Sequence, residues 1–221
     1  MPDPVSILGA TGDLGFGLAV RWATAGVPIV IGSRDAGRAQ EAAERVRAAV
    51  PDAQVEGHGN PEAAAASPVV VMSVPFAGAA ATYKSIAESL KPGALVIDAT
   101  VPLAPAVGGK PTRMVGVWQG SAAQQAAELV PEGVDVVSAL HTVSASSLTD
   151  LGHALAEDVL VCGDRRDPKH AAIELIGRIE GLRAIDAGRL ELSRVTESLT
   201  ALLISLNIKH KTHAGIRITG V

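Results

Sequence analysis

Continuous apolar runs alternate with helix-like segments along the first 140 residues. The runs cover residues 5–8, 28–31, 69–73 and 94–98, with a weaker one at 54–56. Strands that are apolar throughout, without alternation, are typical of a parallel sheet buried on both faces. The segments between them, residues 13–24, 36–49 and 78–90, have helical composition and spacing. Since right-handed crossovers join such strands, the pattern predicts an α/β fold with a doubly wound parallel Rossmann-type sheet.

The second half is less regular. Prolines and glycines between residues 102 and 111 predict a long loop after the fifth strand, at the carboxyl edge where ligands bind in such folds. Further elements are expected as a helix near 121–129, strands at 134–139, 159–162 and 183–185, a helix near 168–180, and a long helix over 190–210. We therefore expect a main domain over residues 1–140 and a smaller C-terminal α/β extension over 141–221 that ends in the long helix.

Three glycines follow the first strand at three-residue spacing: Gly9, Gly12 and Gly15. A strand that turns through glycines into a helix brings backbone N–H groups and the positive end of the helix close to a pyrophosphate. The spacing G-x-x-G-x-x-G differs from the commoner G-x-G-x-x-G, so a purely structural turn is the alternative. Its position directly after an N-terminal strand favours dinucleotide binding.

The second strand ends in Gly32-Ser33-Arg34, and Arg38 follows one helical turn later. An NAD-binding fold usually has an acidic residue at this strand tip, for the ribose hydroxyls. A serine and an arginine here suit the 2′-phosphate of NADP, because Arg can bind a phosphate bidentately. The alternative is a helix-capping serine beside two solvated arginines. Together with the glycine motif, the residues favour NADP.

Two further strand ends carry candidate residues. Val74 and Pro75 close the fourth strand, where the proline either shapes a wall against the nicotinamide or simply ends the strand. His141 follows the strand at 134–139, where it could orient a nicotinamide or a substrate carbonyl, act as an acid or base, or be structural.

Composition excludes several classes of function. The net charge is −4 and aromatic residues make up 2% of the chain, which argues against nucleic-acid binding. Cys162 is the only cysteine, so no internal disulfide or multi-cysteine metal cluster is expected, and its apolar strand predicts a core position. No apolar run is long enough to span a bilayer, and the start Met-Pro-Asp-Pro does not resemble a signal peptide. We expect no metal site, no membrane association and a cytoplasmic location.

Five segments occur in the order found in one enzyme family. They are residues 9–15, 32–34, 137–142 and 161–164, and a set running from 181 to 200 that ends in Glu197-Ser198-Leu199-Thr200. In these segments the chain resembles the F420-dependent NADP oxidoreductases, also called NADPH-dependent F420 reductases. The first two segments are shared with many NADP enzymes, and the later three are much more specific. The resemblance implies hydride transfer between NADPH and the deazaflavin coenzyme F420, in either direction, in a homodimer.

The resemblance also implies roles for individual residues. The pyrophosphate would be held by Thr11, Gly12, Asp13 and Leu14, and the 2′-phosphate by Ser33, Arg34 and Arg38. The deazaflavin and nicotinamide would be bordered by His141 and Val143, with Ser198 and Thr200 on the C-terminal helix near the deazaflavin. The basic tail over 209–217 could attract the phosphate and oligoglutamate of F420, or be solvated or contact a second subunit.

Direct hydride transfer needs donor and acceptor carbons about 3–3.5 Å apart with water excluded, and little acid–base chemistry. Two other functions remain open at this stage. An NADP-dependent reductase of a small carbonyl or imine would generally use a lysine acid after the nucleotide domain, but no lysine occurs between Lys110 and Lys169. A non-catalytic NADP-binding module would bind NADPH without turnover and expose an apolar face on the C-terminal helix.

Overall fold

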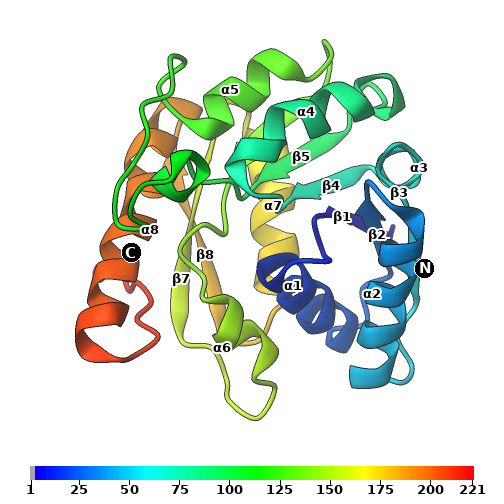
Figure 1. Cartoon of the computed structure of the whole chain (residues 1–221), viewed down its shortest axis with the longest axis horizontal. Helices are drawn as coiled ribbons and strands as arrows, with labels where there is room; N and C mark the ends of the chain where they lie inside the picture. Colours follow the sequence, from blue (N-terminus) through cyan, green and yellow to red (C-terminus); the bar gives the residue numbers. More distant parts are fainter. Residues whose placement is uncertain (1–2) are drawn as a thin grey trace.

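The computed structural model describes residues 3–221 and contains an eight-stranded sheet in the order β3-β2-β1-β4-β5-β6-β7-β8 (Figure 1). The strands are β1 (Val5–Leu8), β2 (Ile29–Ser33), β3 (Val55–Gly59), β4 (Val69–Met72), β5 (Leu95–Asp98), β6 (Asp135–Ser138), β7 (Glu157–Gly163) and β8 (Leu182–Gly188). The first six are parallel to one another, as the continuous apolar runs predict. The predicted doubly wound α/β fold is confirmed.

Helices cover both faces of the sheet, and each face has its own apolar core. One core joins the sheet to α1 (Asp13–Thr24), α2 (Ala36–Ala49) and α7 (Arg166–Gly177). The other joins it to α3 (Asn60–Ala65), α4 (Phe76–Ile86) and α5 (Ala122–Leu129). Trp22 is fully buried on α1 and its indole N–H donates to the carbonyl of Leu175 at 2.9 Å, which fastens α1 to α7. The core side chains are therefore almost all aliphatic.

The carboxyl ends of the first six strands are level at one edge of the sheet. Leu8 pairs with Gly32 on one side and Met72 on the other, and Asp98 pairs with both Met72 and Ser138. Ligands bind at this edge in open α/β sheets, so the loops after β1, β2, β4, β5 and β6 are the candidate site.

The C-terminal extension joins the same sheet through a reversed strand. β7 is antiparallel to β6, and only Val137–Gly163 and Ser138–Cys162 are paired. Because the pairing involves the last residues of both strands, the earlier part of β7 projects past the carboxyl edge by about 16 Å. β8 runs parallel to β7 along its length and projects with it. The two strands thus form a side wall next to the loops of the candidate site.

Several element limits differ from those the sequence predicts. The helix expected over 78–90 is α4 followed by a 3₁₀ turn over Ala87–Ser89, and α8 (Ser193–His210) begins only after a 3₁₀ turn over Leu190–Leu192. The sequence analysis missed α6 (Ala145–Thr149), which at five residues is too short to show a helical period. Among the described residues, no helix combines the length and apolar character needed to cross a membrane.

The C-terminal tail is fastened to β7 by a buried carboxylate. Asp158 accepts hydrogen bonds from Nε and Nη2 of Arg183 at 2.9 and 2.8 Å and from the backbone N–H of Ile218 at 2.6 Å. These bonds, with Arg217 at 3.3 Å, hold the pKa of the Asp158 carboxyl well below its usual range. Arg217 of the basic tail therefore forms an ion pair with Asp158 within the protein.

Candidate cofactor site

The turn after β1 is shaped by two glycines that leave no room for side chains. Gly9 has φ +100°, and a Cβ there would lie 2.8 Å from the backbone nitrogen of Val74. At Gly15 a Cβ would lie 2.5 Å from Oγ of Ser73 and 2.7 Å from Cα of Ala10. The turn can therefore pack directly against the end of β4. Glycine at both positions is required by backbone contact, which the spacing of the motif alone could not show.

The start of α1 presents free backbone donors at the carboxyl edge. Gly12 is the N-cap residue and supplies no side-chain cap, while its own N–H bonds the carbonyl of Gly9 at 2.9 Å. Within residues 3–221, the N–H groups of Asp13, Leu14 and Gly15 have no hydrogen-bond acceptor. Gly12 and Asp13 are exposed, and Thr11 and Leu14 are half-buried beside them. Unpaired donors at a helix N-terminus form a binding place for an anion.

The end of β2 presents two unpaired arginines. Asp35 caps α2, since its carboxylate accepts from the N–H groups of Gly37 at 2.8 Å and Arg38 at 3.4 Å. A capping role for Ser33 is therefore wrong; its hydroxyl instead accepts from the N–H of Asp35 at 3.3 Å. Arg34 and Arg38 are exposed, and in the part of the chain that the structure describes their side chains make no hydrogen bond or ion pair. Both guanidinium groups are free to bind an anion.

A cavity of about 630 Å³ adjoins Arg34 along the edge strand β3. Besides Arg34 it is lined by His58 and Asn60 from the end of β3 and the start of α3, and by Gln40 of α2. β3 lies next to β2, with Gly32 paired to His58 and Ser33 to Gly59. The cavity therefore continues from the exposed arginine at the end of β2 into a recess with the volume of part of a nucleotide.

Val74 and Pro75 lie directly beside the glycine turn. Pro75 is the N-cap residue of α4 and is exposed, and Val74 is half-buried against Gly9. The side chain of Ser73 donates to the carbonyl of Leu8 at 3.0 Å, which holds the ends of β1 and β4 together. The structure thus brings Val74 and Pro75 to the same edge as the glycines, within reach of one ligand.

His141 follows β6 through a turn in which Leu140 has φ +70°, a left-handed conformation unusual for a residue other than glycine. The imidazole is 7% exposed, and Nε2 lies 2.9 Å from Oγ of Ser138. Burial lowers the pKa of His141 to about 4, so the ring is neutral near pH 7. A neutral, enclosed ring can position its neighbours and is unsuited to donate a proton.

Helix α8 brings Thr200 to the same place. Its hydroxyl donates to the backbone carbonyl of His141 at 2.9 Å, although the two residues are 59 positions apart. Val143 is buried close by in sequence, whereas Ser198 is exposed and donates to the carbonyl of Arg194 one turn earlier. The structure therefore joins His141 and Thr200 directly, and it shows no direct contact of Ser198 with either.

Glu197 is a residue whose role the sequence analysis did not identify. It is 1% exposed on α8, and its carboxylate accepts from the N–H groups of Ala122 at 2.9 Å and Ala123 at 3.1 Å, at the start of α5. Burial raises the pKa of Glu197 to about 7, against the opposing effect of these two hydrogen bonds. The contact ties α8 to the start of α5, and no local pattern in the sequence could predict it.

The fold and the loops at its carboxyl edge define a Rossmann-type α/β protein in which a glycine turn leads into a helix with free N–H groups. Residues 4–102 match the profile of the family described as NADP oxidoreductase, coenzyme F420-dependent. The F420-dependent NADP reductase of Methanothermobacter thermautotrophicus is 44% identical over 221 residues, which covers 98% of this chain and 95% of that protein. That of Methanocaldococcus jannaschii is 42% identical over 222 residues, covering 98% of each. The chain belongs to the F420-dependent NADP reductase family.

Solved structures agree with this membership. A crystal structure from Arthrobacter sp., provisionally described as an F420 dependent NADP-reductase, matches with a TM-score of 0.83 and 26% identity over 99% of this chain and 100% of that one. A reductive aminase from Aspergillus terreus in complex with NADPH4 matches with a TM-score of 0.63 and 15% identity, over 96% of this chain and 63% of that one. At that identity the second likeness concerns the fold alone.

We predict that the His141→Gln variant loses less unfolding free energy than the wild type when the pH is lowered. The folded protein holds the ring with a pKa of about 4, whereas the unfolded chain takes up a proton near the ordinary value of 6.5. As the pH falls from about 6.5 to about 4, this residue should therefore cost the wild type up to ~3 kcal/mol of unfolding free energy. Urea unfolding at several pH values measures the difference between the two proteins. An identical pH dependence in both would contradict the burial of a neutral ring.

Proposed function

We propose that this protein transfers a hydride directly between NADPH and the deazaflavin coenzyme F420, in either direction. The observation that carries the proposal is the identity of 42% to 45% with three F420-dependent NADP reductases along nearly the whole chain. The geometry of the carboxyl edge is consistent with this activity. The glycine turn with its free N–H groups lies there, and so do His141 and Thr200, which would border the second ring. The protein would thus be an oxidoreductase with NADP(H) and F420 as its two small-molecule partners.

The dinucleotide would lie across the first two strand ends. The free N–H groups at the start of α1 fit a pyrophosphate, and Gly9 and Gly15 let the turn approach it without side chains. Ser33, Arg34 and Arg38 would hold the 2′-phosphate, because both guanidinium groups are exposed and unpaired in the described part of the chain. The residues of this site are then Gly9, Thr11, Gly12, Asp13, Leu14, Gly15, Ser33, Arg34 and Arg38.

The deazaflavin would lie between the main sheet and the C-terminal extension. Residues 1–140 would form the NADP-binding domain, and residues 141–221 would complete the F420 site. His141, Val143 and Thr200 would border the two rings, with Ser198 on the exposed side of α8 and Val74 and Pro75 against the nicotinamide. The side wall of β7 and β8 would limit access of water from one side.

The reduced nicotinamide or the reduced deazaflavin supplies the hydride when bound. The residues of this chain then have to hold two rings in register and exclude water. His141 is neutral and buried, so it would act by orienting its own backbone and that of Val143, with its carbonyl fixed by Thr200. Among residues 3–221 no group of three or more His, Cys, Asp or Glu side chains is arranged to hold a metal ion.

A reductase of small carbonyls or imines is less well supported. The lysine acid that such enzymes generally use after the nucleotide domain has no counterpart between Lys110 and Lys169. The likeness to the reductive aminase, at 15% identity, extends to the fold alone.

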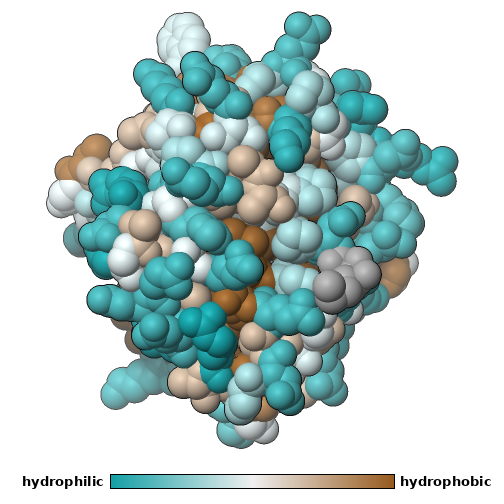
Figure 2. All heavy atoms as spheres, turned by 90° about the vertical axis from the view of Figure 1, so that its right-hand side faces the viewer, coloured by the Kyte–Doolittle hydropathy of each residue, from teal (hydrophilic) through white to brown (hydrophobic). Residues whose placement is uncertain are grey.

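A homodimer is part of the proposal, and α8 is the face that would form it. Val195 and Leu202, seven residues apart on this helix, are each 55% exposed, and Leu192 and Ile208 are exposed as well. By contrast, the face on the right of Figure 1, seen in Figure 2, is mostly hydrophilic with a short apolar strip at its centre. Covering the exposed side chains of α8 against a second copy would remove them from water.

We also propose a cytoplasmic location, because the single cysteine, Cys162, is buried and unpaired, as is common in proteins of a reducing compartment.

The direct test mixes the purified protein with NADPH and oxidised F420. We expect the visible absorption band of oxidised F420 to disappear as NADP⁺ is formed, and to return when reduced F420 and NADP⁺ are mixed. If the protein binds NADPH but the absorption spectra of both cofactors stay unchanged at every pH between about 5 and 9, the proposed activity is refuted and a non-catalytic module is favoured.

We predict that Arg34→Ala weakens NADPH binding by about tenfold to a hundredfold, since a charge-assisted bond to a dianionic phosphate is lost. The affinity for F420 should stay unchanged. Fluorescence titration with NADPH, NADH and F420 separates these effects. Arg178→Ala, an exposed arginine at the end of α7, is the matched control and should bind all three as the wild type does. Equal losses for NADPH and NADH would show that Arg34 does not contact the 2′-phosphate.

We predict that Leu202→Lys converts the dimer to a monomer, because it places a charge in the middle of the apolar face of α8. Light scattering after size-exclusion chromatography gives the mass of each protein. Val107→Lys is the control that should leave the mass unchanged, because Val107 is an exposed apolar residue outside α8. A wild type that is monomeric would remove the dimer from the proposal.

A further inference from the structure

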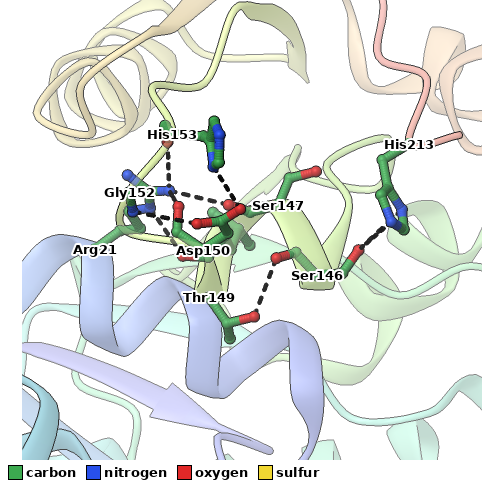
Figure 3. A network of polar contacts seen from close by, with 9 residues as sticks. Arg21, Ser146, Ser147, Thr149, Asp150, Gly152, His153 and His213 are labelled. Carbon is green, nitrogen blue, oxygen red and sulfur yellow. Dashed lines mark hydrogen bonds and ion pairs between the residues drawn. The ribbon is translucent and has the colours of Figure 1, made fainter.

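Arg21 is a buried arginine that binds backbone carbonyls in place of a carboxylate. It lies on α1 and is 8% exposed. Its Nε donates to the carbonyl of Leu148 at 2.8 Å, and its Nη2 donates to those of Ser147, Asp150 and His153 at 3.0, 2.6 and 3.1 Å. Figure 3 shows the side chain of Arg21 beside the segment that carries these carbonyls, with dashed lines for the hydrogen bonds. Within residues 3–221 it forms no ion pair.

The four acceptors belong to one short segment, residues 144–153, which contains α6 and the loop after it. A helix of five residues is not stable by itself, and its last carbonyls have no partners inside the helix. The guanidinium supplies those partners. A planar fork with several N–H donors can reach four oxygens, whereas a lysine ammonium would act from a single point.

Packing reinforces the same contact. Leu148 of α6 is fully buried, and a Cβ on Gly17 of α1 would lie 2.6 Å from Cβ of Leu148. The two helices therefore approach as closely as glycine allows. On the other side of the segment, Oγ of Ser146 lies 3.0 Å from Nδ1 of His213 in the C-terminal tail (Figure 3). Arg21 is the more buried of the two attachments, and its bonds are the more numerous.

The segment continues directly from the proposed deazaflavin wall. His141 and Val143 come immediately before it, and Ser144 is the N-cap residue of α6. The same helix α1 that carries Arg21 begins at the anion-binding glycine turn. The first turn of α1 thus lies at the proposed dinucleotide site, and Arg21 in its third turn binds the segment that follows His141 and Val143.

We propose that Arg21 is a positioning residue for the deazaflavin side of the site. It holds segment 144–153 against α1 and thereby sets the place of His141 and Val143. This proposal rests on the proposed function for its ligand, but the clamp itself does not depend on it. Arg21 would touch neither cofactor.

The test uses Arg21→Met, which keeps an unbranched apolar stem and removes every donor, and Arg21→Lys, which keeps the charge. For Arg21→Met we expect the dissociation constant of F420 to rise by about tenfold or more and that of NADPH to stay unchanged. Arg21→Lys should fall between the methionine variant and the wild type. Hydrogen exchange of the ligand-free proteins should become faster over 144–153 in both variants. Arg47→Met is the control, since Arg47 on α2 also donates to a carbonyl, that of Val55, away from this segment.

Each outcome decides between the alternatives. Parallel losses of NADPH and F420 affinity would mean that Arg21 only stabilises the fold, and unchanged F420 affinity with unchanged exchange would overturn the clamp. If Arg21→Met does not fold, Arg21→Lys alone still separates these results. A wild type that fails to bind F420 would refute the proposed function, and hydrogen exchange would then still test the clamp.

Discussion

The contact between the first βα turn and the end of β4 is the constraint on which the rest of the site depends. The spaces beside Gly9 and Gly15 are filled by backbone atoms and by the hydroxyl of Ser73, which follows β4, so the turn packs closely against the end of that strand. This contact fixes where α1 begins and hence where its free N–H groups point. It also determines which surface of α1 meets α6, since Gly17 and Arg21 lie further along the same helix.

Buried polar groups join the C-terminal extension to this frame. Glu197 binds the start of α5, Asp158 binds Arg183 and the tail, and Arg21 binds the segment after His141. Each contact links residues far apart in sequence. Loss of one partner would lower the stability of the fold, because the other polar group would stay buried without its hydrogen bonds. Such contacts specify one arrangement of the extension, which apolar packing of alanine, valine and leucine alone would specify less sharply.

The sequence predicted most of the sheet and the first half of the site. Continuous apolar strands and the spacing of Gly9, Gly12 and Gly15 depend on local chemistry, so they can be read along the chain. It could not show that β7 is reversed, because apolar composition does not encode strand direction. Nor could it identify Arg21 or Glu197, whose partners lie more than seventy positions away. The helix α6 was missed because its stability comes from Arg21 and Leu148 packing and not from its own residues.

The reversed strand also has a consequence for how the site could change over evolution. The side wall beside the carboxyl edge is made of the main chain of β7 and β8, so its height depends on strand length more than on side-chain size. Side chains alternate between the two faces of a strand with a period of two. Insertion or deletion of residue pairs in both strands would therefore raise or lower this side wall, and every remaining side chain would keep its face. The height of the wall and the side chains that line it could therefore change independently of each other.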